Sequence, residues 1–419
     1  MAQLSDDCFA FGGELLGVDA ALALIEARVA PVVQAERVSL AAAAGRILSQ
    51  DLLAAIDVPP YANSAVDGYA LAHADLSPDS DTVLQVGGRA AAGRPLGRAL
   101  KPGEAIRIFT GAPMPDGADT VMMQEDCVLE AGHVRLKPGL KKGANRRHAG
   151  EDVARDTVAL AAGRRLRPAD LGLAAALGCD ELLAFRPLRV ALLSTGDEVR
   201  DPGAPLPPGA IYDANRAMLA ALLRGLGGAI GADAEIADRA AVLADTLAAA
   251  AAAHDLIVTS GGVSTGEEDH VRAAIEQLGR LDFWRLAIKP GRPVALGQVR
   301  GVPLIGLPGN PVAAALTFAI LARPLILRLA GASPAPPLTF PAAAGFSYKK
   351  RPGRREYLRA RLLRDAASAP VAHKFARDGA GILSSIVQSD GFAVLGEDVR
   401  DLKPGMAIEF LPFSEVFGS

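Results

Sequence analysis

An alternation of apolar strands and helices between residues 187 and 330 constrains the fold of this chain more than any other feature. The predicted strands are 188–193, 229–236, 256–258 and 302–307. The predicted helices are 214–226, 239–253, 268–278 and a segment of about twenty residues that Pro311 opens. Because such alternation is typical of a parallel-rich sheet covered by helices on both faces, we predict a three-layer α/β unit here.

The rest of the chain shows other sequence patterns than this strand–helix alternation. Val18, Leu22 and Ile25 fall on one helical face, and residues 17–55 are therefore predicted as mainly helical. Residues 166–183 are predicted as helical too, with Pro168 near the first position. Between them, short alternating runs and Pro-Gly and Asp-Gly turns predict a β domain up to about residue 150, inserted between two helices that pack together. After the Pro-rich linker 333–341, short strands and turns return.

Composition narrows the possible functions. The chain has 44 Lys and Arg against 47 Asp and Glu, a net charge of −3, which gives no global field for nucleic acid or an anionic membrane. Cys8, Cys127 and Cys179 form no CxxC pair, so we predict neither disulfides nor a thiolate zinc site. The first residues resemble no signal peptide, and the most apolar stretch, 312–322, is about half the length of a membrane span. We therefore expect a cytoplasmic protein that binds neither nucleic acid nor membrane.

Three predicted strands end in polar, glycine-rich loops, where ligands bind in an open α/β sheet. The loops are Ser194–Glu198, Ser260–Asp269 and Leu307–Pro311. The second resembles a phosphate cradle, although Glu267 and Glu268 stand where a P-loop has Lys and Ser or Thr. Its alternative interpretation is a tight turn with acidic residues at a helix start. The third loop is either a helix N-cap alone or an anion-binding helix start.

Charged residues cluster near these loops in the sequence. Asp197, Glu198, Asp269 and Asp238 are oxygen donors of the kind that magnesium prefers. Each alone would more simply be a helix cap or a solvated charge, but together in one crevice they would form a metal or acid–base site. Lys289 and Arg292 flank a Pro-Gly turn, which suits an oxyanion or phosphate. As an isolated pair they would more simply be surface charges.

Seven segments in this order resemble the MoeA-type molybdopterin molybdenumtransferases, which are related to the C-terminal domain of gephyrin. The segments are 63–70, 110–112, 150–152, 194–198, 260–264, 289–291 and 307–311. The resemblance covers nearly the whole chain. It implies a homodimer of four-domain subunits and a reaction in which molybdate enters adenylylated molybdopterin, AMP is released and magnesium assists.

The implied domains are a discontinuous helical linker or dimerisation domain, an inserted β domain, a molybdopterin-binding α/β domain and a C-terminal β domain. Their predicted ranges are 1–58 with 153–185, then 59–152, 186–332 and 333–419. The fold class is therefore multidomain α/β plus β. In the family, the substrate cleft lies between subunits, where Asp67 of one faces the α/β domain of the other.

The resemblance also implies roles for individual residues. The implied catalytic residues are Asp67, Thr110, Asp152, Glu198, Asp269 and Lys289, of which Glu198 and Asp269 would hold the metal. The implied substrate-binding residues are Ser194, Thr195, Gly196, Asp197, Asp238, Ser260, Gly261, Gly262, Ser264, Arg285, Arg292, Pro308, Gly309, Asn310, Arg354 and Ser384. Arg285 stands where the family often has a second lysine, and Arg354, Ser384 and Ser385 resemble positions that hold molybdate.

Two alternative functions remain open at this point. A molybdopterin adenylyltransferase shares the α/β domain, but that domain alone would suffice for adenylylation. A scaffold or receptor anchor related to gephyrin would have a groove for an amphipathic peptide, which nothing in the sequence demands.

Overall fold

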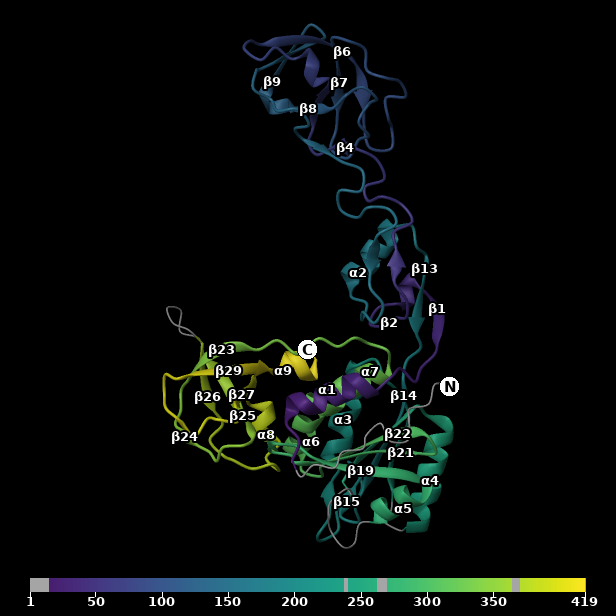
Figure 1. The fold of residues 1–419 in the computed structure, drawn as a ribbon, viewed down its shortest axis with the longest axis vertical. Helices are drawn as coiled ribbons and strands as arrows, with labels where there is room; N and C mark the ends of the chain where they lie inside the picture. Colours follow the sequence, from purple (N-terminus) through teal and green to yellow (C-terminus); the bar gives the residue numbers. More distant parts are fainter. Residues whose placement is uncertain (1–14, 237–239, 262–269, 364–369, 419) are drawn as a thin grey trace.

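The molecule is elongated, with its parts arranged along one long axis (Figure 1). The structure, a computed structural model, describes residues 15–236, 240–261, 270–363 and 370–418. A β domain lies at one end and a small domain in the middle. The α/β sheet and a second β domain lie beside each other at the other end. The predicted multidomain α/β plus β class is confirmed.

The β domain at the far end is built on a six-stranded sheet in the order β8–β5–β7–β6–β10–β9. Successive residues of β5 contribute to two different hydrophobic clusters, because neighbouring side chains of a strand point to opposite faces. The strands are β5 (Gly68–Leu71), β6 (Thr82–Ala90), β7 (Glu104–Ile108), β8 (Thr120–Met123), β9 (Cys127–Glu130) and β10 (His133–Leu136). At its base, β4 (Asn63–Ser64) pairs with β11 (Arg146–Arg147), and short 3-10 helices are η2 (His73–Asp75) and η3 (Gln124–Asp126).

The middle domain combines small sheets with one helix. β13 (Glu181–Phe185) lies between β1 (Ala35–Ser39) and β2 (Ile47–Leu48), and β3 (Leu52–Leu53) pairs with β12 (Val158–Leu160). Helix α2 (Pro168–Ala176) packs on them through Ala174 in a shared cluster, and η1 (Leu40–Ala42) is a 3-10 turn.

The prediction of helix over 17–55 is wrong beyond Arg28. Helix α1 covers only Val18–Arg28, and the following run contains Pro31 and several valines, which favour extended chain. Likewise the predicted helix 166–183 ends at Ala176, and Gly178 then adopts a φ of +82° before β13 begins. The two helices also do not pack together, since α1 belongs to the core of the α/β unit and α2 to that of the middle domain.

The α/β unit contains a six-stranded sheet in the order β17–β14–β18–β22–β21–β19. The first four strands are parallel, and β21 and β19 add an antiparallel edge that the sequence analysis missed. The strands are β14 (Arg189–Thr195), β17 (Ala229–Ile236), β18 (Leu256–Ser260), β19 (Gly279–Arg285), β21 (Pro293–Val299) and β22 (Val302–Leu307). Beyond the sheet, β15 (Val199–Arg200) pairs with β16 (Ile211–Tyr212).

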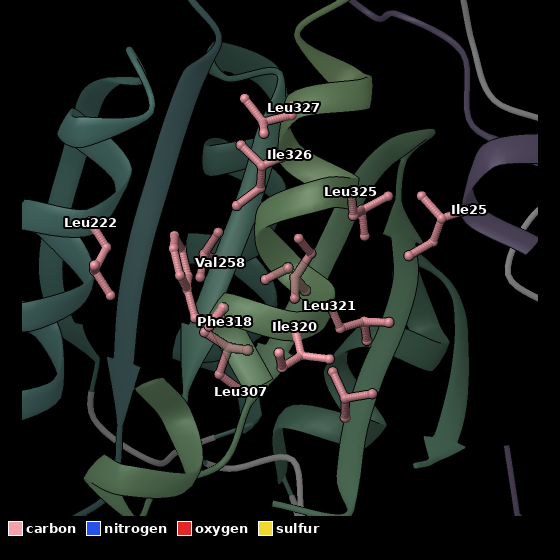
Figure 2. Close-up of a cluster of buried hydrophobic side chains, with 14 of the residues drawn as sticks. Ile25, Leu222, Val258, Leu307, Phe318, Ile320, Leu321, Leu325, Ile326 and Leu327 are labelled. Atoms are coloured by element: carbon pink, nitrogen blue, oxygen red, sulfur yellow. The ribbon is translucent and has the colours of Figure 1, made fainter. Parts of the chain in front are cut away.

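Helices cover both faces of this sheet, as predicted. Helices α4 (Ala240–Ala253) and α5 (His270–Leu278) share one cluster with β14 and β18, and α3 (Ala214–Gly225) belongs to the cluster on the other face. Figure 2 shows part of the second cluster, where Phe318 and Leu321 lie among Val258, Leu307 and other strand and helix residues.

One continuous helical segment forms the centre of that second cluster. It consists of α6 (Pro311–Thr317), the π-helix η4 (Phe318–Ala322) and α7 (Arg323–Leu329). The whole segment is long and apolar enough to cross a membrane, but 83% of its most apolar window is buried inside the protein. A mostly buried core helix can meet the same criteria of length and composition, and the burial here is that of a core helix.

The C-terminal β domain is joined to the α/β unit by backbone pairing. Its sheet runs in the order β20–β25–β26–β23–β29–β27 and closes through β25 and β27, while β20 (Ile288–Lys289) comes from the α/β unit. The other strands are β23 (Phe340–Ala344), β25 (Arg355–Leu363), β26 (Val371–Lys374), β27 (Gly391–Leu395) and β29 (Ala407–Pro412), with the pair β24 (Tyr348–Lys349) and β28 (Asp401–Leu402). Two short helices are α8 (Ser384–Val387) and α9 (Phe413–Phe417).

Candidate functional site

The carboxyl ends of three central strands of the α/β sheet meet at one edge. β14 pairs in parallel with β18, with Ser194 opposite Ser260, and β18 pairs with β22, with Ser260 opposite Leu307. Parallel neighbours end at the same edge of a sheet, where ligands bind in folds of this kind. The structure therefore brings together these predicted residues, which follow or end the three strands: Ser194, Thr195, Gly196, Asp197, Glu198, Ser260, Gly261, Pro308, Gly309 and Asn310.

Gly261 allows the second and first loops to approach each other closely. Its φ is +83°, and a Cβ added to it would lie 2.7 Å from the carbonyl oxygen of Thr195. Its N–H donates to the carbonyl oxygen of Leu307 at 3.2 Å, which also ties it to the third strand. Only glycine combines this backbone conformation with so close a neighbour.

Asn215 joins the second and third loops, and the sequence analysis missed it. Its Nδ2 donates to Ser260 Oγ at 2.9 Å and to the carbonyl oxygen of Gly309 at 2.7 Å. The residue is buried near the start of α3, whose N-cap Asp213 accepts a hydrogen bond from Arg216 N. The only local signal was an Asp and an Asn at the beginning of a predicted helix.

Several polar atoms at this edge are buried and have no hydrogen-bond partner among the described residues. They are Ser194 Oγ, Thr195 Oγ1 and Asn215 Oδ1. Because buried polar groups are nearly always paired, these atoms are candidates for contacts with a polar ligand. Thr259 Oγ1 likewise has no hydrogen-bond partner among the described residues, whereas Asp213 Oδ2 lies 3.3 Å from Arg216 Nε in an ion pair.

Of the two acids predicted to hold the metal, only Glu198 lies within the described residues. Glu198 is exposed, and its Oε2 lies 2.5 Å from the place that a Cβ on Gly196 would take. The other four predicted residues of this region, Asp238, Gly262, Ser264 and Asp269, lie outside the described residues. Among the described residues, no group of three or more His, Cys, Asp and Glu side chains is arranged to hold a metal ion.

A second group of predicted residues lies at the seam between the α/β unit and the C-terminal β domain. Lys289 Nζ donates to Tyr348 Oη at 3.1 Å and lies 3.3 Å from Glu356 Oε2. Tyr348 Oη donates to the same Glu356 Oε2 at 2.9 Å, and Arg354 Nε donates to Glu356 Oε1 at 2.9 Å. Lys289, Tyr348, Arg354 and Glu356 are called the cation cluster below. Tyr348 and Glu356 were not predicted.

The cluster stabilises the charged forms of Glu356 and Lys289. Burial alone would raise the pKa of Glu356, but hydrogen bonds from Tyr348 and Arg354 and the charge of Lys289 together hold it below its ordinary value. Burial alone would lower the pKa of Lys289, but its contacts with Tyr348 and Glu356 raise it above the ordinary value. At neutral pH the two cations and one carboxylate therefore carry a net positive charge.

Helix α6 connects the strand-end group to the cation cluster. It starts directly after the third loop, and the turn that carries Lys289 packs on it: a Cβ on Gly291 would lie 2.7 Å from Thr317 Oγ1 and 3.1 Å from the carbonyl oxygen of Ala313. Arg285 and Arg292 lie on the same turn, since Arg285 pairs with Pro293, and both side chains are exposed. Asn310 stands at the N-cap of α6, but its side chain makes no capping hydrogen bond.

The loop before α8 also contacts α6. Val312 N donates to the carbonyl oxygen of Ala380 at 2.8 Å. Ser384, at the start of α8, is exposed, whereas Ser385 is buried. Ser385 Oγ accepts from Arg359 Nε at 2.9 Å and donates to the carbonyl oxygen of Ile382 at 2.6 Å, so its hydroxyl holds the loop in place.

The remaining predicted residues lie far from both groups within one chain. Asp67 Oδ1 accepts from Thr110 N and from Thr110 Oγ1, both at 2.8 Å, and these two hydrogen bonds lower the pKa of Asp67. This pair belongs to the β domain at the opposite end of the long axis (Figure 1). Asp152 is exposed in the connection below that domain, where its N–H donates to the carbonyl oxygen of Val58 at 3.0 Å. One chain therefore does not bring Asp67, Thr110 and Asp152 to the strand ends.

Three parts of the chain match known families. Residues 16–178 match the MoeA N-terminal region (domain I and II), residues 191–328 match a probable molybdopterin binding domain, and residues 341–413 match the MoeA C-terminal region (domain IV).

Whole proteins and solved structures match over nearly the entire chain. A molybdopterin molybdenumtransferase of Haemophilus influenzae is 38% identical over 387 residues, which cover 92% of this chain and 95% of that protein. Molybdopterin molybdenumtransferase 2 of Mycobacterium tuberculosis is 36% identical over 387 residues, 89% of this chain and 93% of that protein. The crystal structure of a molybdopterin biosynthesis MoeA protein from Pyrococcus horikoshii superposes with a TM-score of 0.81 at 25% identity, covering 95% of this chain and 100% of that one.

Proposed function

Because this chain belongs to the MoeA family of molybdopterin molybdenumtransferases, we propose that it inserts molybdate into adenylylated molybdopterin and releases AMP. The family resemblance stated from the motifs is confirmed. Similarity along nearly the whole chain carries this proposal, since all the parts of the relatives are present and not the α/β unit alone.

The geometry supports this reaction through two neighbouring binding groups. The strand ends present buried oxygens that have no partner within the described part of the chain and that suit the polar pterin and the phosphates. The cation cluster presents two cations that suit a small tetrahedral oxyanion. Because α6 begins at the third loop and contacts the turn that carries Lys289, we propose that the pterin adenylate lies at the strand ends and molybdate at the cation cluster, with Ser384, Arg285 and Arg292 beside it.

We propose magnesium as the metal, with Glu198 and Asp269 as its protein ligands. Glu198 fits this role because it is an exposed carboxylate in the loop that follows β14, three residues after Thr195, and hard oxygen donors suit magnesium. The bound ion would neutralise the phosphoanhydride charge. Asp197 and Asp238 are proposed to bind substrate at the same edge.

We further propose that the working unit is a homodimer. Asp67, Thr110 and Asp152 lie far from the strand ends in one chain, and a second copy would bring its own set to that edge. In a two-fold dimer, each of two equivalent sites would combine the β domain of one protomer with the α/β unit of the other.

Turnover in a purified system tests the reaction. The protein is incubated with adenylylated molybdopterin, magnesium and molybdate, and both AMP and active cofactor are measured. We expect both products to appear together and to be lost in Glu198→Ala or Asp269→Ala that still folds. AMP transfer from ATP to molybdopterin would instead support an adenylyltransferase, and unchanged turnover in both variants would contradict the roles assigned to these acids.

Mixed dimers test whether the site is shared. The Asp67→Ala and Glu198→Ala variants are each expected to be inactive. Asp67 belongs to the half of the shared site that the β domain supplies, and Glu198 to the half that the α/β unit supplies. Co-refolding equal amounts makes half of the dimers mixed, each with one intact site, so activity should return to about a quarter of the wild-type value. If mixing restores no activity, the site is not shared, and the β domain and the α/β unit of the same chain would have to act together.

We also propose a cytoplasmic location, without nucleic acid or membrane as partners. It is supported by the near-neutral net charge and by the free thiols of Cys127 and Cys179. A fluorescent fusion that follows the membrane fraction would contradict this proposal.

A further inference from the structure

Glu356 is the most deeply buried member of the cation cluster. Its side chain is 0% exposed, whereas the side chains of Lys289 and Arg354 are 44% and 23% exposed. Both carboxylate oxygens are used, Oε1 by Arg354 and Oε2 by Tyr348 and Lys289. A buried carboxylate is stable only when it is paired in this way, and its partners are held by it in turn.

The hydrogen bonds to Glu356 leave part of each cation available. Of the three N–H donors of Lys289, one points to Tyr348 and one to Glu356. Arg354 uses Nε, and its two Nη groups have no partner within the described part of the chain. A single carboxylate therefore gathers two cations and leaves some donors of both unused by it, with a net charge of +1 for the three groups.

Tyr348 fixes the position of the Lys289 ammonium group. Its hydroxyl accepts from Lys289 and donates to Glu356, so the ammonium group touches both ends of one O–H···O bond. The ammonium group also lies 5.7 Å from the centre of the Tyr348 ring, within the range of a cation–π contact. A flexible lysine side chain is thus restricted by three contacts with two residues.

We propose that Glu356, together with Tyr348, is a positioning residue that holds Lys289 and Arg354 in the arrangement that receives the oxyanion substrate. The inference rests on the proposed function for the identity of that oxyanion as molybdate. Glu356 itself does not touch molybdate, because its oxygens face the two cations and would repel a dianion. It acts through the two cations alone.

A purely structural role for Glu356 at the seam is less consistent with the contacts. The seam is already joined by backbone bonds, among them Arg355 N to the carbonyl oxygen of Ala287 at 2.8 Å. The ion pair between Arg355 and Asp19, at 2.9 Å, joins the C-terminal domain to α1 separately. Neither contact involves Lys289 or Arg354, which offers a matched control.

The test compares Glu356→Gln, which keeps the shape and removes the charge, with Asp19→Asn, which removes the other ion pair at the seam. The molybdate concentration at half-maximal rate is measured, along with kcat and the corresponding value for adenylylated molybdopterin. We expect Glu356→Gln to raise the molybdate value about tenfold, the effect of losing charge-assisted hydrogen bonds, with the pterin value unchanged. Asp19→Asn should leave both values as in the wild type.

Introducing the same change into Lys289→Ala/Arg354→Ala separates positioning from general damage. If Glu356 acts only through the two cations, Glu356→Gln has no further effect on the molybdate value in that background. A further tenfold loss there would overturn the inference, and so would a wild-type molybdate value in the single variant. An equal rise in the pterin value would also overturn it.

Equilibrium dialysis with molybdate alone keeps this inference distinct from the proposed function. If the wild type binds molybdate and Glu356→Gln binds it less tightly, the inference stands even where no cofactor is formed and the proposed function fails. If the wild type forms cofactor while Glu356→Gln matches it in binding and rate, only the inference fails. Should Glu356→Gln not fold, Tyr348→Phe replaces it, with an expected rise of roughly threefold from one lost hydrogen bond, and no rise would overturn the inference.

Discussion

Replacing Gly261 by alanine should disrupt the strand-end group by forcing two strand ends apart. Gly203 offers a matched control, because it too has a strongly positive φ, +93° against +83°, but nothing lies within 4 Å of a Cβ added there. Both variants pay the cost of a side chain at a left-handed backbone, about 1–2 kcal/mol. Any further decrease in the free energy of unfolding of Gly261→Ala therefore results from crowding of the new Cβ alone.

The extra loss follows from the distance to Thr195. The new Cβ would lie 2.7 Å from its carbonyl oxygen, whereas ordinary contact begins at 3.4 Å. The two strand ends must therefore move apart by about 0.7 Å, in an interior that is otherwise close-packed. Overpacking of this kind costs about 1–3 kcal/mol, which is the expected difference between the two variants in free energy of unfolding.

Trp284 reports the unfolding of this sheet. It is the single tryptophan of the chain, it lies on β19, and it is 1% exposed. Urea unfolding followed by its fluorescence should show a lower midpoint for Gly261→Ala than for Gly203→Ala. Turnover of adenylylated molybdopterin should fall in the first variant and persist in the second. Equal midpoints and equal turnover would refute the view that close approach at Gly261 shapes the site.

Three further changes test other contacts. Burial favours a higher pKa for Asp255, but hydrogen bonds from two arginines outweigh it and hold the pKa below the unfolded value of about 3.9. Its stabilisation is thus present above that pH and lost as the pH falls below it, so Asp255→Asn should cost roughly 3 kcal/mol at pH 7 and progressively less in acid, by Trp284 fluorescence. Asn215→Ala should leave its two acceptors unpaired, cost about 1–3 kcal/mol and raise the pterin concentration at half-maximal rate. Thr110→Val removes one donor to Asp67, so the pKa of Asp67 should rise and the acid limb of the pH–rate profile should move to higher pH.

Sequence reasoning succeeded where the signal was periodic. The strands 188–193 and 302–307 were predicted because their apolar runs are continuous, and the polar loops after them could be placed at one edge by the rules of parallel sheets. It failed on β19 and β21, whose runs are interrupted by charged residues and glycines. It also extended α1 past Arg28, because periodicity alone does not distinguish a short apolar run in a helix from one in a strand.

The site was predictable only where a local motif existed. Lys289 lies in such a motif, but Glu356 does not, since a Glu after two arginines ordinarily indicates a surface ion pair. Its burial and its two cationic partners depend on the pairing of β20 with β25, which joins segments 67 residues apart. The same holds for Asn215, whose partners lie on two other loops. Contacts of this kind form only in the tertiary structure, so the spacing of residues along the sequence does not predict them.

The chain enters and leaves the far β domain at almost the same point. Val58 and Val153 form an antiparallel bridge, and just beyond it Asn63 and Ser64 pair with Arg147 and Arg146. Opposed residues of an antiparallel pair have Cα atoms about 5 Å apart, a gap that a tight turn can close. The whole domain is therefore a removable module, whose gain, loss or exchange in evolution would require the remaining fold to change only one turn.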